Sequence, residues 1–356
     1  MMPSFGGPQG RSERAKGRTG RATSLDVARR AGVSQSAVSR VFTEGASASA
    51  AMSKRVQKAA KEIGYRPNVL ARSLITGRSR MVALVVAYLD NQFYPDALER
   101  FSKAFQEKGY HILVFLTPNG TDQQAQAVVD ELLDYQVDGI VTASVSLSEN
   151  LTRRCRESGI PMLLFNRNQG EEGPPSVTSD NVDGARKVGK FLVQAGYRRI
   201  AHVSGWQGSS TGRERERGIR QGLAECGMQL VGCLDGMYDR QTAMQATRRM
   251  CGPDGCKPDA LFVGNDHMAF AVLDVLRHEL SLRVPEDIAV VGYDDVQAAS
   301  WPSYDLTTFS QPVERMVETT VGELIKRIKD PDLPRRQVRL VGELKVRGTT
   351  RRVGEA

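Results

Sequence analysis

From Met81 onward, short apolar runs alternate with amphipathic stretches of helical length, and few folds accommodate such a pattern. The apolar runs are MVALVVAY (81–88), HILVFL (111–116), VDGIVTA (137–143), IPMLLFN (160–166), RIAHVS (199–204), DALFVGN (259–265) and DIAVVGY (287–293). Runs of this kind are typical of strands buried on both faces, so we predict an α/β fold of parallel sheets flanked by helices. Because about 270 residues are more than one hydrophobic core usually contains, two lobes are expected.

The first 80 residues differ from the rest of the chain in charge. They contain 16 Lys/Arg and 4 Asp/Glu, a formal charge of +12, which leaves −4 for the other 276 residues of a chain whose net charge is +8. A basic segment on a mildly acidic body indicates a polyanionic partner, most often nucleic acid. For residues 1–21, which are rich in Gly, Arg and Ser, a solvated disordered tail is the simpler interpretation.

Two short helices joined by a tight turn are predicted just after this tail. Thr23 can cap the first helix together with Asp26, and Gly32 can adopt the left-handed conformation that ends it. Ser34 can cap the second helix. A third helix is expected from about Ala51 to Ile63.

The second of these helices has one apolar and one polar side. Val38, Val41 and Phe42 form its core-facing stripe. Its polar side consists of Gln35, Ser36, Ser39 and Arg40, residue types that hydrogen-bond base edges. The pattern fits a helix-turn-helix, and it also fits an ordinary helical hairpin of a core. The charge of the segment favours DNA binding.

Several motifs in the same order resemble the lactose-repressor/galactose-repressor family of bacterial transcription regulators. They are DVARRAGVSQSAVSRVF (26–42), GYRPNVLARSLITG (64–77), DNVDGARKVGKFLVQAGYRRIAHVSG (180–205), TGRERERGI (211–219), FVGNDHMAFAVL (262–273), PEDIAVVGYDD (285–295) and LTTFSQP (306–312). The resemblance runs from about residue 23 to 349 and implies a ligand-responsive DNA-binding regulator, most often a repressor, that is not an enzyme.

The resemblance also implies a domain order. We expect a disordered basic tail (1–21), a helix-turn-helix headpiece (22–67), a hinge helix or linker (68–79) and an effector-binding and dimerisation core (80–356). Within the core, the first lobe is expected at about 80–178 and 312–337 and the second at about 179–309 and 338–350. The core would be similar to periplasmic sugar-binding proteins.

Roles in DNA binding follow from the family positions. Base readout is assigned to Gln35, Ser36 and Arg40, and backbone contacts to Thr23, Ser34 and Ser39. Asn68, Ala71 and Leu74 belong to the hinge, where the leucine of relatives enters the minor groove. Packing of Leu74 against Leu70 is the alternative. The chain departs from the family pattern at Ile75 and in ASASAAMSKRV (46–56), which begins the third helix.

A small polar effector is expected in the cleft between the lobes, and a sugar or sugar acid is the favoured class. Family positions assign its binding to Phe93, Tyr94, Asn166, Arg215, Asn265, Asp294, Gln311 and Trp301. Arg167, Trp206 and Arg213 are further candidates. Taken singly, each of these residues also fits a surface or capping role.

Two other classes of protein share some of these features. Gly208-Ser209-Ser210-Thr211-Gly212 matches the nucleophile-elbow pattern of hydrolases, but Trp206 and Gln207 separate it from the preceding strand. A periplasmic binding protein would have the same core, but no secretory signal is evident and the basic headpiece would be unexplained.

Composition also bears on metals, cofactors, membrane contact and oligomeric state. The five cysteines form no CxxC pair, so we expect reduced thiols and neither a metal nor a cofactor. No apolar run has membrane-spanning length, and we expect a cytoplasmic protein without membrane contact. Since no leucine heptads follow residue 349, a homodimer on palindromic double-stranded DNA is predicted.

Overall fold

The computed structural model describes residues 22–42, 46–66, 78–117, 128, 130–143 and 149–354. The chain divides into two compact units, Met1–Ser79 and Arg80–Ala356. Within the first unit, the described helices are α1 (Ser24–Ala31), α2 (Gln35–Phe42) and α3 (Ala50–Glu62). Val27, Val38 and Val56, one from each helix, are fully buried in a shared apolar core.

The helix ends of this headpiece form as predicted. The Asp26 amide donates to the Thr23 hydroxyl at 3.3 Å, the Thr23 amide donates back to the Asp26 carboxylate at 3.0 Å, and Gly32 has φ +64°. Ser34 accepts from the Ala37 amide at 3.2 Å and so caps α2. Ser49 caps α3 through the Met52 amide, so the first turn of this helix forms despite the departure from the family pattern.

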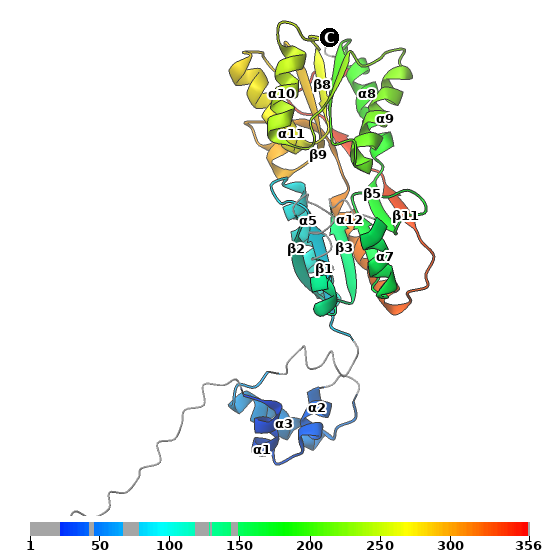
Figure 1. The fold of residues 1–356 in the computed structure, drawn as a ribbon. Helices are drawn as coiled ribbons and strands as arrows, with labels where there is room; N and C mark the ends of the chain where they lie inside the picture. Colours follow the sequence, from blue (N-terminus) through cyan, green and yellow to red (C-terminus); the bar gives the residue numbers. More distant parts are fainter. Residues whose placement is uncertain are drawn as a thin grey trace, which may run out of the picture. The chain divides into compact units, whose positions relative to one another are not determined.

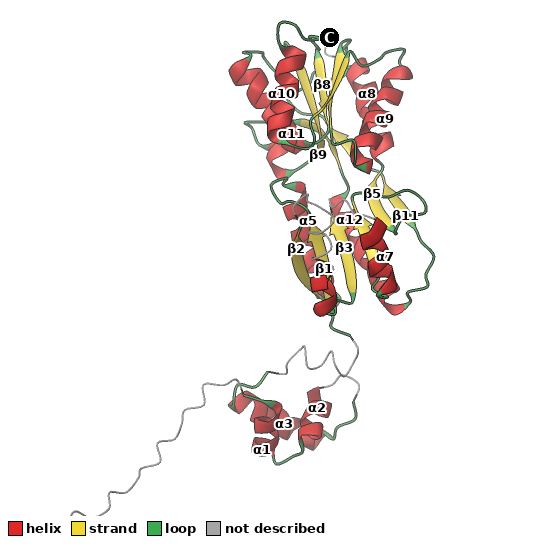
Figure 2. Ribbon diagram, viewed as in Figure 1, coloured by secondary structure: helices red, strands yellow, loops and turns green. Residues whose placement is uncertain are grey.

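The second unit has two lobes, each built on a six-stranded sheet (Figures 1 and 2). In the first lobe the strand order is β11-β5-β4-β3-β1-β2, and every neighbouring pair is parallel. Its strands are β1 (Met81–Val86), β2 (His111–Leu116), β3 (Gly139–Ala143), β4 (Met162–Phe165), β5 (Ser176–Ser179) and β11 (Gln337–Leu340). Its helices include α5 (Phe93–Glu107), α7 (Glu149–Glu157) and α12 (Val313–Lys329).

The second lobe repeats this plan with the order β12-β10-β9-β8-β6-β7, where only the β10–β12 pair is antiparallel. Its strands are β6 (Ile200–Ser204), β7 (Gly232–Asp235), β8 (Ala260–Val263), β9 (Ala289–Asp294), β10 (Thr307–Ser310) and β12 (Glu343–Lys345). Helices α8 (Asn181–Gln194) and α9 (Ser210–Ala224) lie on one side of this sheet, and α10 (Arg240–Cys251) and α11 (Asp266–Asp274) lie on the other (Figure 2). The predicted α/β fold of parallel sheets flanked by helices is therefore confirmed.

The chain passes between the lobes after Ser179, after Ser310 and after Leu340. The last passage lies a few residues beyond the expected limit near 337, because β11 continues to Leu340 in parallel pairing with β5. Residues placed at these passages can respond to the angle between the lobes. In the described ranges, no helix is both long enough and apolar enough to cross a membrane.

Helices α8 and α9 pack closely through glycines. A Cβ atom at Gly218 would lie 2.3 Å from the Val182 carbonyl oxygen, and one at Gly222 would lie 2.2 Å from the Arg186 carbonyl oxygen. Both distances are shorter than van der Waals contact, so these positions admit no side chain unless the helices separate. The close approach brings the first turns of α8 and α9, which carry polar side chains, to the same end of the lobe.

We predict that Gly222→Ala lowers the free energy of unfolding by about 1–3 kcal/mol, since the rigid backbone of α8 must move away. Gly322→Ala is the matched control, because Gly322 lies within α12 with no other atom within 4 Å of its added methyl group. There the better helix propensity of alanine should raise stability by about 0.5–1 kcal/mol. Urea denaturation of both variants measures the difference, and equal losses would contradict the close helix contact.

Candidate functional site

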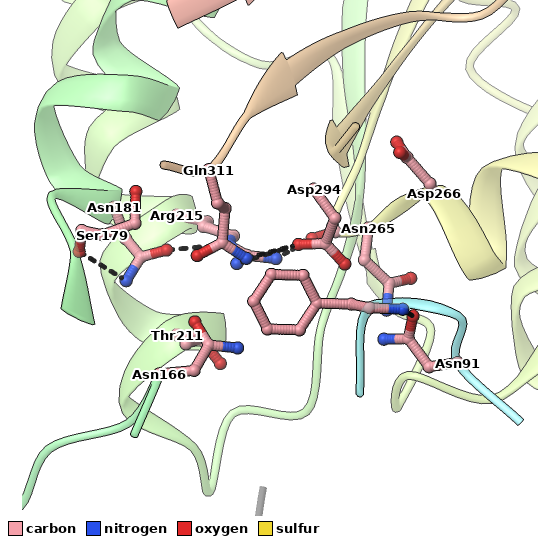
Figure 3. Close-up of polar contacts among 12 residues, drawn as sticks. Asn91, Asn166, Ser179, Asn181, Thr211, Arg215, Asn265, Asp266, Asp294 and Gln311 are labelled. Atoms are coloured by element: carbon pink, nitrogen blue, oxygen red, sulfur yellow. Dashed lines mark hydrogen bonds and ion pairs between the residues drawn. The ribbon is translucent and has the colours of Figure 1, made fainter. Parts of the chain in front are cut away.

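A buried polar cluster lies where the lobes meet, and Arg215 is at its centre (Figure 3). This side chain extends from α9 and is 2% exposed. Its Nε donates to Asn181 Oδ1 at 3.0 Å, its Nη1 donates to the Gly264 carbonyl at 2.6 Å, and its Nη2 lies 3.4 Å from Asp294 Oδ1. The guanidinium also lies 3.8 Å from the centre of the Tyr293 ring. Arg215 is thereby fixed in one position.

The carboxylate of Asp294, at the end of β9, is shared between Arg215 and Gln311. The Gln311 amide donates to Asp294 Oδ1 at 2.7 Å. Burial raises the pKa of Asp294, while the charge of Arg215 opposes this rise. Asp294 has φ +124° and Asn166, at the end of β4, has φ +67°. Backbone strain at two strand ends that face one junction is typical of a functional site.

Further hydrogen bonds join the two lobes. Asn168, just after β4, donates from its amide to Ser210 Oγ at 3.0 Å and from its side chain to Glu214 Oε1 at 2.8 Å. Asn181 donates to the other oxygen of Glu214 at 3.0 Å and accepts from Arg215. A continuous polar chain therefore runs from the first lobe through α9 to the central ion pair.

The side-chain amide oxygens of Asn166 and Gln311 are buried without a partner. Asn166 uses its amide nitrogen to donate to the Tyr94 hydroxyl at 3.4 Å, but its Oδ1 accepts nothing. Gln311 likewise donates to Asp294 and leaves its Oε1 unpaired. Since buried polar atoms are normally satisfied, these two oxygens are suited to hydroxyl or amide donors of a ligand.

A cavity of about 800 Å³ lies beside the cluster, between α5 of the first lobe and the segments after β9 and β10 of the second. Phe93, Asp294, Gln311 and Trp301 all line it. Trp301 is 48% exposed at its wall, whereas Phe93 is buried. The volume suits a small organic ligand.

The remaining sequence-predicted residues are placed differently. Asn265 is buried, and its Oδ1 accepts from the Met268 amide at 3.0 Å, so its acceptor is occupied in capping α11. Tyr94 is buried edge-to-face against Tyr88, with ring centres 5.6 Å apart. Arg213 is exposed and donates to the Gln207 carbonyl.

Tyr238 and Asn91 belong to this region and were not predicted. The Tyr238 hydroxyl donates to Thr211 Oγ1 at 2.9 Å, and a side chain at Gly205 would overlap the Tyr238 ring. A hydrogen bond from Asn91 helps to lower the pKa of Asp294 against the dominant effect of burial. Tyr238 follows β7, a half-buried strand without a clear apolar run, so its place at a strand end was not evident.

Asp266 is a second buried carboxylate near this cluster. It accepts from Thr308 Oγ1 at 2.6 Å and from the Val296 amide at 3.0 Å. Burial, with a further contribution from the charge of Asp294, raises the pKa of Asp266 to about 7. Asp266 therefore ties the start of α11 to β10 and to the segment after β9.

In the headpiece, the polar residues of α2 are exposed or half-buried. Gln35 donates to Ser24 Oγ at 2.9 Å, the Ser34 and Ser36 hydroxyls are 2.9 Å apart, and Arg40 is exposed. The backbone candidates Thr23, Ser34 and Ser39 lie at or near the starts and outer sides of α1 and α2. The hinge candidates Asn68, Ala71 and Leu74 lie outside the described residues.

The two serines of the hydrolase-like pattern have other roles in the structure. Ser210 begins α9, and its hydroxyl accepts from the Asn168 amide, while Ser209 caps the same helix. His267 lies early in α11, near Asp90. The cysteines Cys155, Cys226, Cys233, Cys251 and Cys256 are free, and within the described ranges no group of three or more His, Cys, Asp or Glu residues could hold a metal ion.

Known proteins resemble both parts of the chain. Residues 23–68 match the bacterial regulatory proteins of the lacI family, and residues 190–350 match a periplasmic binding protein-like domain. The ribose operon repressor of Escherichia coli (strain K12) is 30% identical over 92% of this chain and 99% of its own length. The HTH-type transcriptional regulator CelR of Thermobifida fusca is 34% identical over 85% of this chain and 90% of its own.

Solved structures agree with these matches. The lac repressor dimer bound to operator and the anti-inducer ONPF has a TM-score of 0.83 at 26% identity, covering 92% of this chain and 99% of that one. A complex of the regulator CelR with cellobiose has a TM-score of 0.68 at 32% identity, covering 92% and 100%. The resemblance drawn from the sequence is confirmed, and the curated relatives are regulators of transcription rather than enzymes.

We predict that Asp266→Asn flattens the dependence of stability on pH. The unfolded carboxyl titrates near pH 3.9, so the folded protein holds this proton more tightly. The resulting stability is fully present below about pH 3.9 and is lost as the pH rises towards 7. Between pH 5 and 7.5 the native protein should lose up to about 1.4 kcal/mol per pH unit more than the variant.

Melting temperatures across this pH range measure the effect. Asp287→Asn is the control, because the hydrogen bond and charge of Arg283 lower the pKa of Asp287 to about 2, below the range tested. This control should keep the native slope. Identical slopes for the native protein and Asp266→Asn would contradict the raised pKa.

Proposed function

Because this chain belongs to the lacI family of bacterial regulatory proteins, we propose that it is a repressor that binds a palindromic operator as a dimer and is switched by a small effector between its lobes. Membership of the family makes it a DNA-binding regulator of transcription. One observation supports the switch above all: a helix-turn-helix and a buried polar cluster at a lobe junction occur in the same chain. The first provides DNA binding and the second provides a place for ligand control.

Ligand control is supported by where the cluster residues lie along the chain. Asn181 follows the passage after Ser179, and Gln311 follows the passage after Ser310. A ligand that bonds to both Gln311 and Asn166 therefore contacts a lobe-to-lobe segment and the first lobe at once. Because it favours one angle between the lobes, it changes the spacing of two headpieces in a dimer. A differential affinity of about 1.4 kcal/mol changes operator affinity tenfold.

The DNA contacts follow from the family positions. Gln35, Ser36 and Arg40 on α2 read bases in the major groove, and Thr23, Ser34 and Ser39 contact the backbone. On the family positions alone, minor-groove contacts are assigned to Asn68, Ala71 and Leu74. The relative crystallised as a dimer on its operator supports this arrangement.

The effector class that fits the cleft is a sugar or a sugar acid. The unpaired oxygens of Asn166 and Gln311 accept from hydroxyl groups, and aromatic residues such as Phe93 and Trp301 line the adjoining cavity. Relatives named for a ribose operon and solved with cellobiose support the same class. A purine is the alternative, and thermal-shift screening of sugars, sugar acids and purines distinguishes them.

We predict that Arg40→Ala weakens binding to a duplex selected from a random-sequence pool by about 1–3 kcal/mol, roughly 5- to 150-fold, because a side chain that reads a base is lost. Binding to unselected DNA should change little. Lys61→Ala, in the last turn of α3, removes the same charge without removing a reader. Gel shifts at several salt concentrations measure the affinity of both variants for the selected and the unselected duplexes. Equal losses on selected and unselected duplexes would reject base readout by Arg40.

We predict that Asn166→Ala removes effector response while leaving operator binding intact. The variant loses one of the two unpaired acceptors at the lobe junction but no contact of the headpiece. The variant should then need at least a tenfold higher concentration of the screened effector to reach the same shift in melting temperature. Its operator affinity without effector should match the native value. A native response in the variant would place the effector elsewhere.

A further inference from the structure

Arg167 differs from the other arginine of the lobe junction in that it has no acidic partner there. It follows Asn166 at the carboxyl end of β4 and is half-buried. Its Nε is buried without a hydrogen-bond partner, and within the described ranges Arg167 forms no ion pair. Arg215, by contrast, is bonded through all three of its nitrogens.

The guanidinium of Arg167 lies among aromatic side chains of both lobes. It is 5.9 Å from the ring centre of Trp206 in the second lobe. Burial raises the pKa values of Tyr88 and Tyr94 in the first lobe, and the charge of Arg167 opposes both rises. The setting combines flat apolar faces, which suit a sugar ring, with one cation.

The carboxylates of this region have partners of two kinds: Asp294 pairs with Arg215, whereas Glu214 and Asp266 accept hydrogen bonds from neutral donors. Arg215 and Asp294 form a buried pair whose side chains are each 3% exposed. Arg167 has no such counterpart, and a partly desolvated charge without a partner is unfavourable. A ligand carboxylate would supply the direct partner that Arg167 lacks, because a planar guanidinium binds a carboxylate through two parallel hydrogen bonds.

We propose that Arg167 binds the carboxylate of a sugar acid, an inference that rests on the proposed function of the cleft. The carboxylate bonds to the guanidinium of Arg167, and ring hydroxyls donate to the unpaired oxygens of Asn166 and Gln311. A monoanion fits better than a phosphate dianion, since the second charge would lie near Asp294 without a further cation. Arg167 thus selects acids over neutral sugars.

Matched pairs of probes test this selectivity. The melting temperature is measured with uronates, aldonates and 2-keto aldonates, each beside its neutral sugar or alditol, with glucose 6-phosphate as a phosphate probe. At least one acid should stabilise the protein in proportion to its concentration, while its neutral counterpart and the phosphate should not. Arg167→Gln should weaken binding of that acid at least tenfold.

Arg217→Gln, on the exposed side of α9, is the control and should bind the acid as the native protein does. Each of four results would overturn the inference. The neutral counterparts could bind as tightly as the acids, or only the phosphate could stabilise the protein. No acid could stabilise it, or Arg167→Gln could bind the acid with native affinity. The regulator itself is tested separately, because operator binding without effector should be native in Arg167→Gln. Loss of all specific DNA binding by the native protein would instead overturn the proposed function.

Discussion

The ion pair between Arg215 and Asp294 holds together the region where the lobes meet. Its atoms are 3.4 Å apart and both side chains are 3% exposed, so the pair is stable only because hydrogen bonds complete it. Asn181 and the Gly264 carbonyl satisfy the guanidinium, and Gln311 satisfies the carboxylate. These partners come from α8, from the end of β8 and from the segment after β10, so one interaction fixes three parts of the core relative to one another.

In the proposed function, the position of this pair is what allows a ligand to act at a distance. Asn181 and Gln311 are part of the cluster and also lie where the chain passes between lobes. The strained backbone at Asn166 and Asp294 presents side chains that relaxed strand ends would turn away. Any molecule that bonds to the unpaired oxygens of this region changes the same contacts that set the lobe angle. In the proposed function, sensing and movement therefore share one set of residues.

Much of the fold was readable from local patterns, and much of the site from strand ends. Arg215, Asp294 and Gln311 meet in one cluster, and Asn166, at the end of β4, is bonded to Tyr94. Asp294, Asn166 and Gln311 lie at or just after the carboxyl ends of strands, where ligand sites of open α/β sheets usually occur. Asn265 also ends a strand, but its acceptor caps α11. That difference depends on the direction of a single side chain, which periodicity does not specify.

By itself, the sequence determined the two α/β lobes, the capped helices of the headpiece and the identity of most polar residues at the junction, since apolar periodicity and capping residues act over a few positions. Only the tertiary structure decided which of these residues are already satisfied. Arg215 is fully bonded and Arg167 is left without an acidic partner, although both are arginines of the lobe junction. Partnership depends on contacts between segments far apart in the chain, and such contacts exist only after the lobes have folded together.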